Sequence, residues 1–336
     1  MSRLPNRMPM GRICITFTSP PETDRWVPGD RWVRPLARRI LRGRPRPGGV
    51  EKVFINLCLG LDRLGVAYET NLPFSSLRPG DLLGVLGRGR GCLEGYRSRQ
   101  PLVAGIGLMT HPSEWPTLFE DYPVACYLQH SPWAADVYRR HYGDRCATWP
   151  VGIDTQAWKP SGPSASKPVD FLIYEKFRWE IPRLDAEFLA PITEALRRRG
   201  QSFRLLRYGS YQPSQFQEAL AACKAAIFLS SHESQGIACL EAMASDVPIL
   251  AWDPGRCLDP ARSAWGDPEI PASSVPFFSA ACGLTFRDLG EFERQLPVFS
   301  DGVAAGAYAP RDFILEGLTV EKCSARFVEI LREKLG

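Results

Sequence analysis

Two glutamates, Glu233 and Glu241, flank a glycine in the stretch Glu233-Ser-Gln-Gly-Ile-Ala-Cys-Leu-Glu241. The apolar run before them, residues 226–229, favours a buried strand, and apolar residues recur at three-residue spacing after Gly236. The pattern predicts a strand, a polar loop with Glu233, and a helix that carries Glu241. The first N–H groups of such a helix lack intrahelical partners and carry the positive end of its dipole, so they can bind phosphate.

This arrangement suits a nucleotide. Glu241 would lie one turn into the helix, where it can accept hydrogen bonds from a ribose while the neighbouring backbone holds phosphate. Glu233, on the loop, can reach the other end of the same ligand. A simpler interpretation is also open, because a glutamate in the first turn of any surface helix favours the dipole, and Ser-His-Glu-Ser is a plausible cap.

Composition places the chain among ordinary globular proteins. Its 336 residues are 44% apolar and 23% charged, which suits two domains of about 150 residues each. A formal net charge of +4 is too small to indicate a nucleic-acid partner. The ten cysteines include no Cys-x-x-Cys pair and several lie in apolar runs, as buried free thiols in a reducing compartment do.

Metal sites, targeting segments and membrane spans are not indicated. None of the four histidines is spaced with a cysteine or carboxylate as metal ligands usually are, so we expect no metal. No signal-like apolar region follows the first ten residues, and no run approaches the roughly 18 apolar residues of a spanning helix. We therefore expect a cytoplasmic protein.

Strands and helices alternate along the chain, which predicts parallel sheets. The first half is expected to contain strands at 12–17, 82–86, 102–106, 124–128 and 146–151, with helices after residue 50 and at 132–142. The second half is expected to contain strands at 171–174, 203–207, 226–229, 248–252 and 283–286, with helices at 185–198, 213–223, after Gly236 and at 320–335. Residues 159–168, rich in proline and serine, indicate a linker.

The expected fold is therefore α/β, with two Rossmann-like domains, each built on a doubly wound parallel sheet. We place the N-terminal domain at 1–152 and the C-terminal domain at 153–318. A last helix, within 319–336, is expected to pack back toward the N-terminal domain. Two such domains face a cleft, where ligands bind at the carboxyl ends of the strands.

Three segments resemble motifs of the GT-B glycosyltransferases, and they occur in the family's order. Trp149-Pro-Val-Gly-Ile-Asp-Thr-Gln-Ala-Trp-Lys-Pro resembles the segment that closes the first domain. The stretch from Glu233, with Glu-x7-Glu followed by Ala-Met-Ala, resembles the signature helix, and Pro47-Gly-Gly-Val-Glu-Lys resembles the glycine loop after the first strand. The chain thus resembles a retaining, family-4-like GT-B glycosyltransferase, and the motifs frame nearly its whole length.

This resemblance implies metal-independent transfer, without a cofactor, from a nucleotide-diphosphate sugar to a glycan or lipid-linked acceptor, with retention at the anomeric carbon. It places Glu233 beside the donor sugar and Glu241 on the ribose hydroxyls. The backbone N–H groups of Gly236, Ile237 and Ala238 would hold the sugar and the phosphates.

Without a metal, the departing diphosphate needs fixed cations. The family places an Arg and a Lys after the first strand of the second domain, where this chain offers Lys176 first and Arg178 second. The family's usual Gly-Arg…Lys-Gly signature is absent here. Gly48 and Gly49 are expected where the backbone approaches phosphate closely, although a tight turn after proline would also use them.

Family members often carry a first-domain histidine that lines the acceptor site or contacts the donor sugar. His111 is the candidate for this role, and His130 is the next. A lone loop histidine is also often just a hydrogen-bonded surface group. Asp246 replaces a usual glycine before Val-Pro, and aspartate tolerates the left-handed conformation.

Other functions remain open. Gly87-Arg-Gly-Arg-Gly points to a dinucleotide site, but Cys92 occupies the position of the third required glycine. A nucleotide-sugar 2-epimerase would share the two-domain cleft. A scaffold could keep the fold and bind a donor without turnover.

The segment from Arg25 to Arg46 carries eight arginines and one aspartate, with two tryptophans among them. It lies between the first strand and its helix, where GT-B enzymes commonly build acceptor loops. Either it contacts an anionic membrane peripherally, at the inner membrane face, or it is a solvated basic loop.

Overall fold

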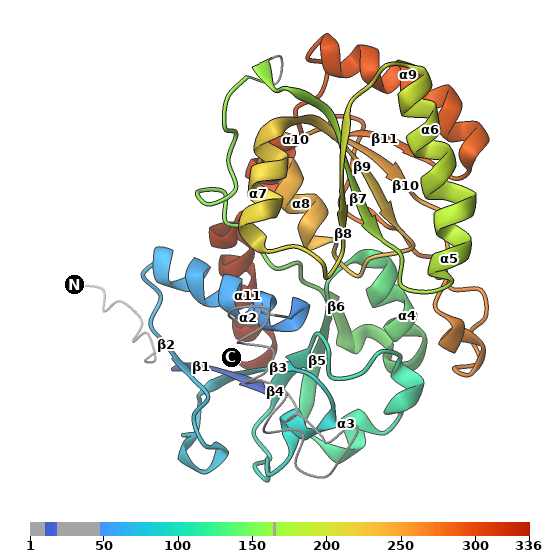
Figure 1. Cartoon of the computed structure of the whole chain (residues 1–336). Coiled ribbons are helices and arrows are strands. Elements are labelled where there is room, and N and C mark those ends of the chain that lie inside the picture. The colour runs from blue at the N-terminus through green and yellow to red at the C-terminus, as the bar shows by residue number, and fades with distance from the viewer. Residues whose placement is uncertain (1–10, 19–47, 164–165) are drawn as a thin grey trace, which may run out of the picture.

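The computed structural model of the chain describes residues 11–18, 48–163 and 166–336. Two α/β domains lie one above the other, the N-terminal domain in blue and green below and the C-terminal domain in yellow and orange above (Figure 1). Each is built on one sheet in which all paired neighbours run parallel. The predicted pair of Rossmann-like domains is confirmed.

The N-terminal sheet has the strand order β2-β1-β3-β4-β5-β6. Its strands are Ile13–Thr18 (β1), Tyr68–Thr70 (β2), Leu82–Gly87 (β3), Leu102–Gly105 (β4), Val124–Gln129 (β5) and Cys146–Thr148 (β6). Its helices are Gly49–Arg63 (α2), Leu118–Asp121 (α3) and Pro132–Tyr142 (α4). One apolar cluster lies under α2, and another lies under α3 and α4 on the opposite face, so the sheet is buried on both sides.

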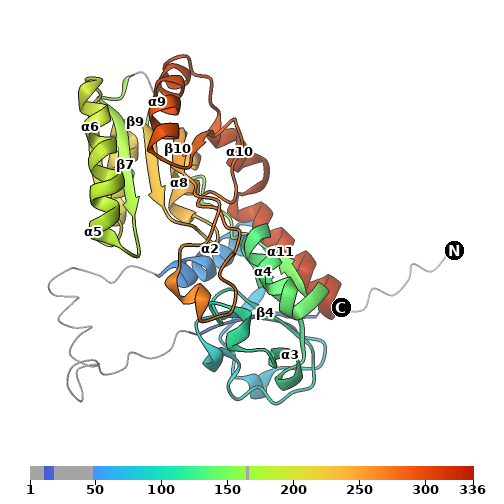
Figure 2. The ribbon, with the colours of Figure 1, turned by 90° about the vertical axis from the view of Figure 1, so that its right-hand side faces the viewer.

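The C-terminal sheet has the order β11-β10-β9-β7-β8. Its strands are Val169–Lys176 (β7), Phe203–Arg207 (β8), Cys223–Ser230 (β9), Ile249–Trp252 (β10) and Gly283–Phe286 (β11). Its helices are Ile181–Leu184 (α5), Ala190–Arg198 (α6), Pro213–Ala222 (α7), Ile237–Ala244 (α8), Leu289–Ala304 (α9) and Pro310–Gly317 (α10). Helices α7, α8 and α10 cover one face, and α6 and α9 the other (Figures 1 and 2).

Several predicted boundaries change. The strand expected at 146–151 ends at Thr148, just before the Trp149-Pro pair. The helix expected at 185–198 is preceded by α5 and begins with a five-residue π turn, Asp185–Leu189. The structure also contains β2, α3, α9 and α10, which were not predicted from the sequence. Helix α9 contains Pro297, a residue that argues against a helix interior.

The structure tests two local predictions, the conformation of Asp246 and the linker at 159–168. Asp246 has φ +58°, so the left-handed conformation expected at this position is confirmed. In the segment expected to be a linker, 159–168, Lys167 is buried and its Nζ donates to the Leu220 carbonyl at 3.1 Å. This part of the segment is therefore fixed to the C-terminal domain, whereas residues 164–165 lie outside the described part.

The last helix, Val320–Leu335 (α11), packs against the N-terminal domain (Figure 1). Trp149, which is fully buried, donates from Nε1 to the Cys323 carbonyl at 2.8 Å and packs on Phe327. Ser324 donates to the Leu57 carbonyl of α2 at 3.1 Å. The chain thus returns from the C-terminal domain to complete the core of the N-terminal one.

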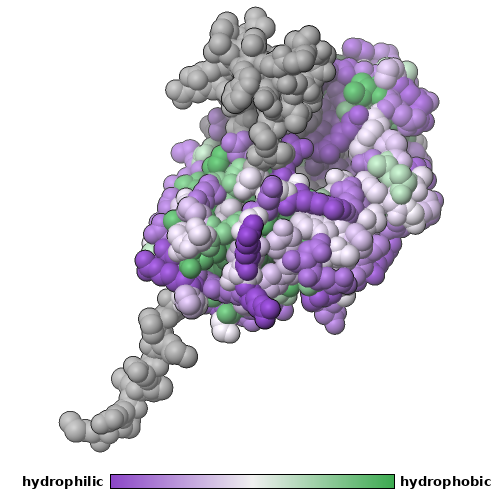
Figure 3. Space-filling model, turned by 90° about the horizontal axis from the view of Figure 1, so that it is seen from below, coloured by the Kyte–Doolittle hydropathy of each residue, from purple (hydrophilic) through white to green (hydrophobic). Residues whose placement is uncertain are grey.

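The burial of the cysteines and the polarity of the surface are those expected from the composition. All ten cysteines are free and nine are buried, which confirms the prediction of buried free thiols. Within the described residues, no helix combines the length and the apolar character needed to cross a membrane. The described part of the face seen from below is mainly polar with small apolar patches (Figure 3). The Arg25–Arg46 segment falls outside the described residues.

The crossing between the domains supplies a stability prediction. A Cβ at Gly152 would collide with the Thr319 carbonyl and the Val320 backbone at the start of α11. Gly152→Ala should therefore lower the free energy of unfolding by about 1–3 kcal/mol, as overpacking does. Urea unfolding followed by circular dichroism measures this loss.

Gly317→Ala is the matched control, because a Cβ there meets no atom and alanine favours a helix. Its unfolding midpoint should equal or slightly exceed that of the wild type. Equal midpoints for Gly152→Ala and the wild type would show that the crossing tolerates the added methyl group.

Candidate functional site

Glu233 and Lys176 form a buried ion pair at the carboxyl edge of the C-terminal sheet. Lys176 ends β7 and Ser230 ends the neighbouring β9, and these two residues are partners in the strand register. Lys176 Nζ lies 2.6 Å from Glu233 Oε1, and Ser230 Oγ donates to the same oxygen at 2.8 Å. The structure therefore brings together two of the three residues predicted to be catalytic.

The charge state of Glu233 follows from its neighbours. Burial raises the pKa of the carboxyl, but the positive charges of Lys176 and Arg178, together with hydrogen bonds from Lys176 and Ser230, outweigh burial and lower the pKa overall. The carboxylate is therefore ionised near neutral pH. It can accept hydrogen bonds from hydroxyl groups and stabilise positive charge, but it has no proton to donate.

Residues of both domains form hydrogen bonds with the loop that carries Glu233. Its backbone N–H donates to the Ser273 carbonyl at 2.9 Å, and its carbonyl accepts from Nε1 of Trp133, on α4 of the N-terminal domain, at 3.0 Å. Gln235 makes two hydrogen bonds with the backbone of Val151, at 2.6 and 3.0 Å. The position of the carboxylate therefore depends on the packing of the two domains.

Gly236 is the N-cap of helix α8 and has φ +77°, a conformation that favours glycine. The three-residue spacing of the apolar residues favours burial of one face, but residues 239–244 are all buried, so this part of the helix is covered on every side. Ile237 and Ala238, at the start, are only half-buried. The N-terminus of this helix is therefore its most accessible part.

Glu241 is buried and its carboxylate is paired with Lys52 of α2 in the other domain. Burial raises the pKa of Glu241 and the Lys52 charge lowers it, with a net rise. Lys52 Nζ also lies 5.5 Å from the centre of the Trp158 ring. The residue expected to bind ribose thus already has a cationic partner, which the sequence analysis did not identify.

Gly48 and Gly49 lie at the N-terminus of α2, one turn before Lys52. Gly48 has φ −65°, and a Cβ at either position would meet no atom. The backbone in this structure therefore does not require glycine at these positions. The phosphate interpretation of the pair stays a prediction.

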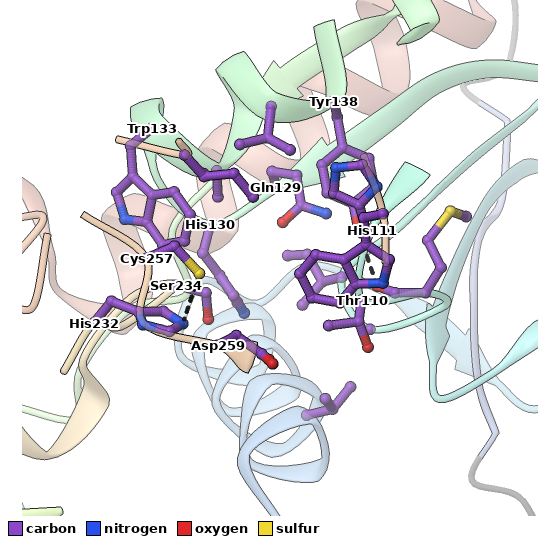
Figure 4. A pocket seen from close by; sticks show the side chains of 18 of the residues that line it. Thr110, His111, Gln129, His130, Trp133, Tyr138, His232, Ser234, Cys257 and Asp259 are labelled. Carbon is purple, nitrogen blue, oxygen red and sulfur yellow. Dashed lines mark hydrogen bonds between the residues drawn. The ribbon is translucent and has the colours of Figure 1, made fainter. Parts of the chain in front are cut away.

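A cavity of about 230 Å³ lies between the domains, beside the Glu233 loop (Figure 4). Most of its described lining comes from the N-terminal domain, and the C-terminal domain supplies Arg178, His232, Ser234, Cys257, Asp259, Trp265 and Ile270. Arg178, His111 and His130 line it. The other predicted site residues, Lys176, Glu233, Glu241, Gly48, Gly49, Gly236, Ile237 and Ala238, do not.

The cavity histidines are neutral at pH 7. Burial lowers the pKa of His130 and of His232 to about 4. Burial, followed by the His141 charge, also lowers the pKa of His111. His111 Nδ1 accepts from the Ser113 N–H at 3.2 Å, so the neutral ring carries its proton on Nε2. Because His111 and His130 both line the cavity, both remain candidates for the acceptor-side histidine.

Two other chemistries lack support from the geometry. Strand β3 leads from Gly87 into a short 3-10 turn, Arg90–Leu93, and not into the helix that a dinucleotide fingerprint requires. In the described residues, no three His, Cys, Asp or Glu side chains gather as metal ligands would.

No known family model matches the sequence, and no curated protein matches it significantly. Solved structures match its fold. TarM has a TM-score of 0.54 at 12% identity, covering 83% of this chain and 58% of TarM. The lipopolysaccharide outer core galactosyltransferase WaaB, in its apo form, has a TM-score of 0.54 at 11% identity, covering 96% of this chain and 100% of WaaB.

Sucrose-phosphate synthase from Thermosynechococcus elongatus has a TM-score of 0.51 at 12% identity, covering 96% of this chain and 98% of that one. This chain has the GT-B fold. It spans less than two thirds of TarM but nearly the full length of the other two proteins. At such low sequence identities, the structural similarity establishes the GT-B fold alone. The activity has to be inferred from the residues of the site.

The buried pair makes a direct prediction for Lys176→Met. The substitution leaves Glu233 without its closest cation, so the free energy of unfolding at pH 7 should fall by about 3–5 kcal/mol. Because the wild-type pKa of Glu233 is lowered from 4.5, its charge stabilises the fold above about pH 4.5 and this contribution is lost as the pH falls. The deficit of the variant should therefore shrink in acid, as chemical unfolding at pH 7 and pH 4 would measure.

Adding Glu233→Gln to Lys176→Met should recover part of the loss, since the buried charge is then removed. Lys159→Met, at an exposed lysine, should change the free energy of unfolding by less than about 0.5 kcal/mol. A double variant less stable than Lys176→Met alone would contradict the assigned pairing.

Proposed function

We propose that this protein is a glycosyltransferase that moves a sugar from a nucleotide-diphosphate sugar to a glycan or lipid-linked acceptor, with retention and without a metal ion. The observation that carries the proposal is the buried Glu233–Lys176 pair beside the N-terminus of α8. In a GT-B fold this edge of the sheet faces the cleft, where ligands of parallel sheets bind.

The diphosphate is assigned to the N-terminus of α8. The N–H groups of Ile237 and Ala238 lie in the first turn of this helix and have no intrahelical acceptor. Lys176 and the exposed Arg178 follow β7 at the same edge. Cations and dipoles fixed there would stabilise the charge that develops on the departing diphosphate, the role that a metal ion plays in other transferases.

The donor sugar is assigned to the Glu233 side of the same edge. An ionised carboxylate can hold sugar hydroxyls and stabilise positive charge that develops at the anomeric carbon. Its two hydrogen-bonding partners and the bonds to its backbone keep it in place before any ligand arrives. Such preorganisation makes an electrostatic contribution effective, because little reorganisation is needed during the reaction.

The ribose is assigned to Glu241. Its hydroxyl groups would share or replace the contact with Lys52, whose Nζ belongs to a partly exposed side chain that can move. A released Lys52 would lie one turn from Gly48 and Gly49, close to the expected path of the diphosphate. Nucleotide binding would in this way exchange one ionic contact between the domains for contacts through the ligand.

A thermal-shift screen tests the donor site. UDP, GDP, ADP, dTDP and CMP, with their common sugars, would be added to the whole chain with and without EDTA. One nucleoside diphosphate should raise the melting temperature by several degrees, since a hundredfold excess over Kd adds about 2.7 kcal/mol. EDTA should leave the shift unchanged. If no nucleotide shifts the transition, the donor assignment is wrong.

Products distinguish the remaining functions. Transfer to an acceptor with a retained anomeric configuration supports the proposal. Inversion at C2 of the sugar without an acceptor would instead indicate an epimerase. Donor binding with neither transfer nor hydrolysis would indicate a scaffold.

The two carboxylates should separate binding from turnover. Glu241→Gln should weaken the affinity for the nucleotide roughly 10- to 100-fold, because a hydrogen bond to a charged group is lost. Glu233→Gln should lower kcat by about 100- to 1,000-fold with a smaller change in donor affinity. Isothermal titration and turnover of labelled donor measure these effects. Wild-type behaviour of both variants would refute the assignments.

A further inference from the structure

The connection between β10 and β11 crosses from the C-terminal domain to the N-terminal one. Figure 2 shows this segment, in orange, reaching down beside α4. Cys257, Ile270 and Ala272 are part of the apolar cluster that includes α4. Arg140 of α4 pairs with Asp267 at 2.9 Å. The segment is thus anchored on the opposite domain by apolar packing and by an ion pair.

This anchoring places Trp265 against His111. The two rings are nearly parallel, at an interplanar angle of 4° with centroids 4.9 Å apart. Both line the cavity, where Trp133 and Tyr138 add further aromatic surface (Figure 4). One wall of the cavity therefore exists only when the two domains are packed together.

Two residues that line the cavity carry polar atoms without hydrogen bonds. His111 Nε2 and His130 Nδ1 form no hydrogen bond with the described residues, and these side chains are 1% and 7% exposed. The carboxylate of Asp267 lies 4.0 Å from His111 Nε2, beyond hydrogen-bonding distance. Buried polar atoms in folded proteins are nearly always paired, so unpaired ones at a cavity indicate a ligand that supplies hydrogen bonds. A ligand with an apolar face and several hydroxyl groups would satisfy both the rings and these nitrogens.

The charges around the cavity favour an uncharged ligand. Among the described residues, its lining contains one guanidinium, Arg178, and one carboxylate, Asp259, while its histidines have lowered pKa values. A carboxylate or phosphate on the ligand would require an excess of cations around it. With Arg178 directed to the donor diphosphate, the remaining charge would repel an anion.

Size and position assign this ligand to the acceptor. The volume of about 230 Å³ is below the roughly 300–1,000 Å³ of pockets for drug-sized ligands, so it suits one ring and not a nucleotide sugar. Apart from Arg178, the residues assigned to the donor lie outside the lining. The cavity adjoins the Glu233 loop through His232 and Ser234, next to the place where transfer would occur.

We infer that this cavity binds one uncharged pyranose ring of the acceptor, and that the Trp265–His111 pair selects it. The inference rests on the proposed glycosyltransferase function. The C–H face of the pyranose packs on the aromatic surfaces, and His111 Nε2–H donates to one of its hydroxyl groups. Trp265 acts as a specificity residue supplied across the cleft by the donor domain.

Saturation-transfer NMR on the whole chain tests this inference with free sugars. The probes are methyl glucoside, methyl galactoside and methyl N-acetylglucosaminide, compared with methyl glucuronide and glucose 6-phosphate. At least one uncharged glycoside should bind at millimolar concentration, and both charged sugars should bind at least fivefold more weakly. Equal affinity for charged and uncharged sugars, or no binding by any of them, would overturn the inference.

Substitutions at the residues that line the cavity test whether the sugar binds there. Trp265→Ala should weaken glycoside binding at least tenfold, whereas Trp265→Phe, which keeps a stacking ring, should stay within about threefold. His111→Phe keeps the ring and removes Nε2, so it should also weaken binding several-fold. It serves as the test if Trp265→Ala proves unstable. Phe203→Ala, at the amino end of β8 and outside the lining, is the aromatic control and should bind as the wild type does.

Failure of this inference is distinguishable from failure of the proposed function. A nucleotide thermal shift without glycoside binding would refute the acceptor pocket and leave the donor site intact. Glycoside binding that depends on Trp265, without any nucleotide shift, would support the pocket and refute the donor assignment. Binding that is unaffected by both Trp265→Ala and His111→Phe would place the sugar elsewhere and overturn the inference.

Discussion

Keeping an ionised carboxylate inside the protein is the constraint on which the site depends. Glu233 is buried, and burial alone would favour its neutral form. Its charge persists because β7 and β9 run side by side in a register that puts Lys176 and Ser230 opposite each other at their ends. The sheet thus fixes a cation and a hydroxyl beside the loop, and under the proposed function the carboxylate charge that they maintain would act on the donor sugar.

Glu241, eight residues further along the chain, is also a buried carboxylate, but its charge is compensated in a different way. Its cationic partner among the described residues, Lys52, belongs to the other domain and is partly exposed. The pKa of this carboxyl is raised, whereas that of Glu233 is lowered. The Glu233 charge is therefore fixed within one domain, whereas the Glu241 charge depends on how the domains meet. The first suits a group that must stay in place during a reaction, and the second suits a contact that a ligand replaces.

The sequence predicted the features that depend on residues close together in the chain. The apolar runs located most strands, and the Glu-x7-Glu spacing placed Glu233 and the start of α8 correctly. Helix α9 was missed because Pro297 lies inside it, where its neighbours' packing on the sheet outweighs the lost hydrogen bond. Lys52 and Trp265 were missed because each acts on a residue in the other domain, more than 150 positions away, and no spacing rule encodes such a contact.

The same interdomain packing sustains both halves of the site. Trp133 reaches the Glu233 carbonyl from α4, Gln235 holds Val151, and Trp265 covers His111. If the domains separated, the loop with Glu233 would lose its hydrogen bond from Trp133 on α4. The cavity would at the same time lose the wall that contains Trp265. Under the proposed function, residues from either domain alone could bind part of a substrate, but only their packing would place a sugar ring beside the ionised carboxylate. Under the same proposal, the energy that holds the domains together would also align the two reactants, which is the entropic part of catalysis.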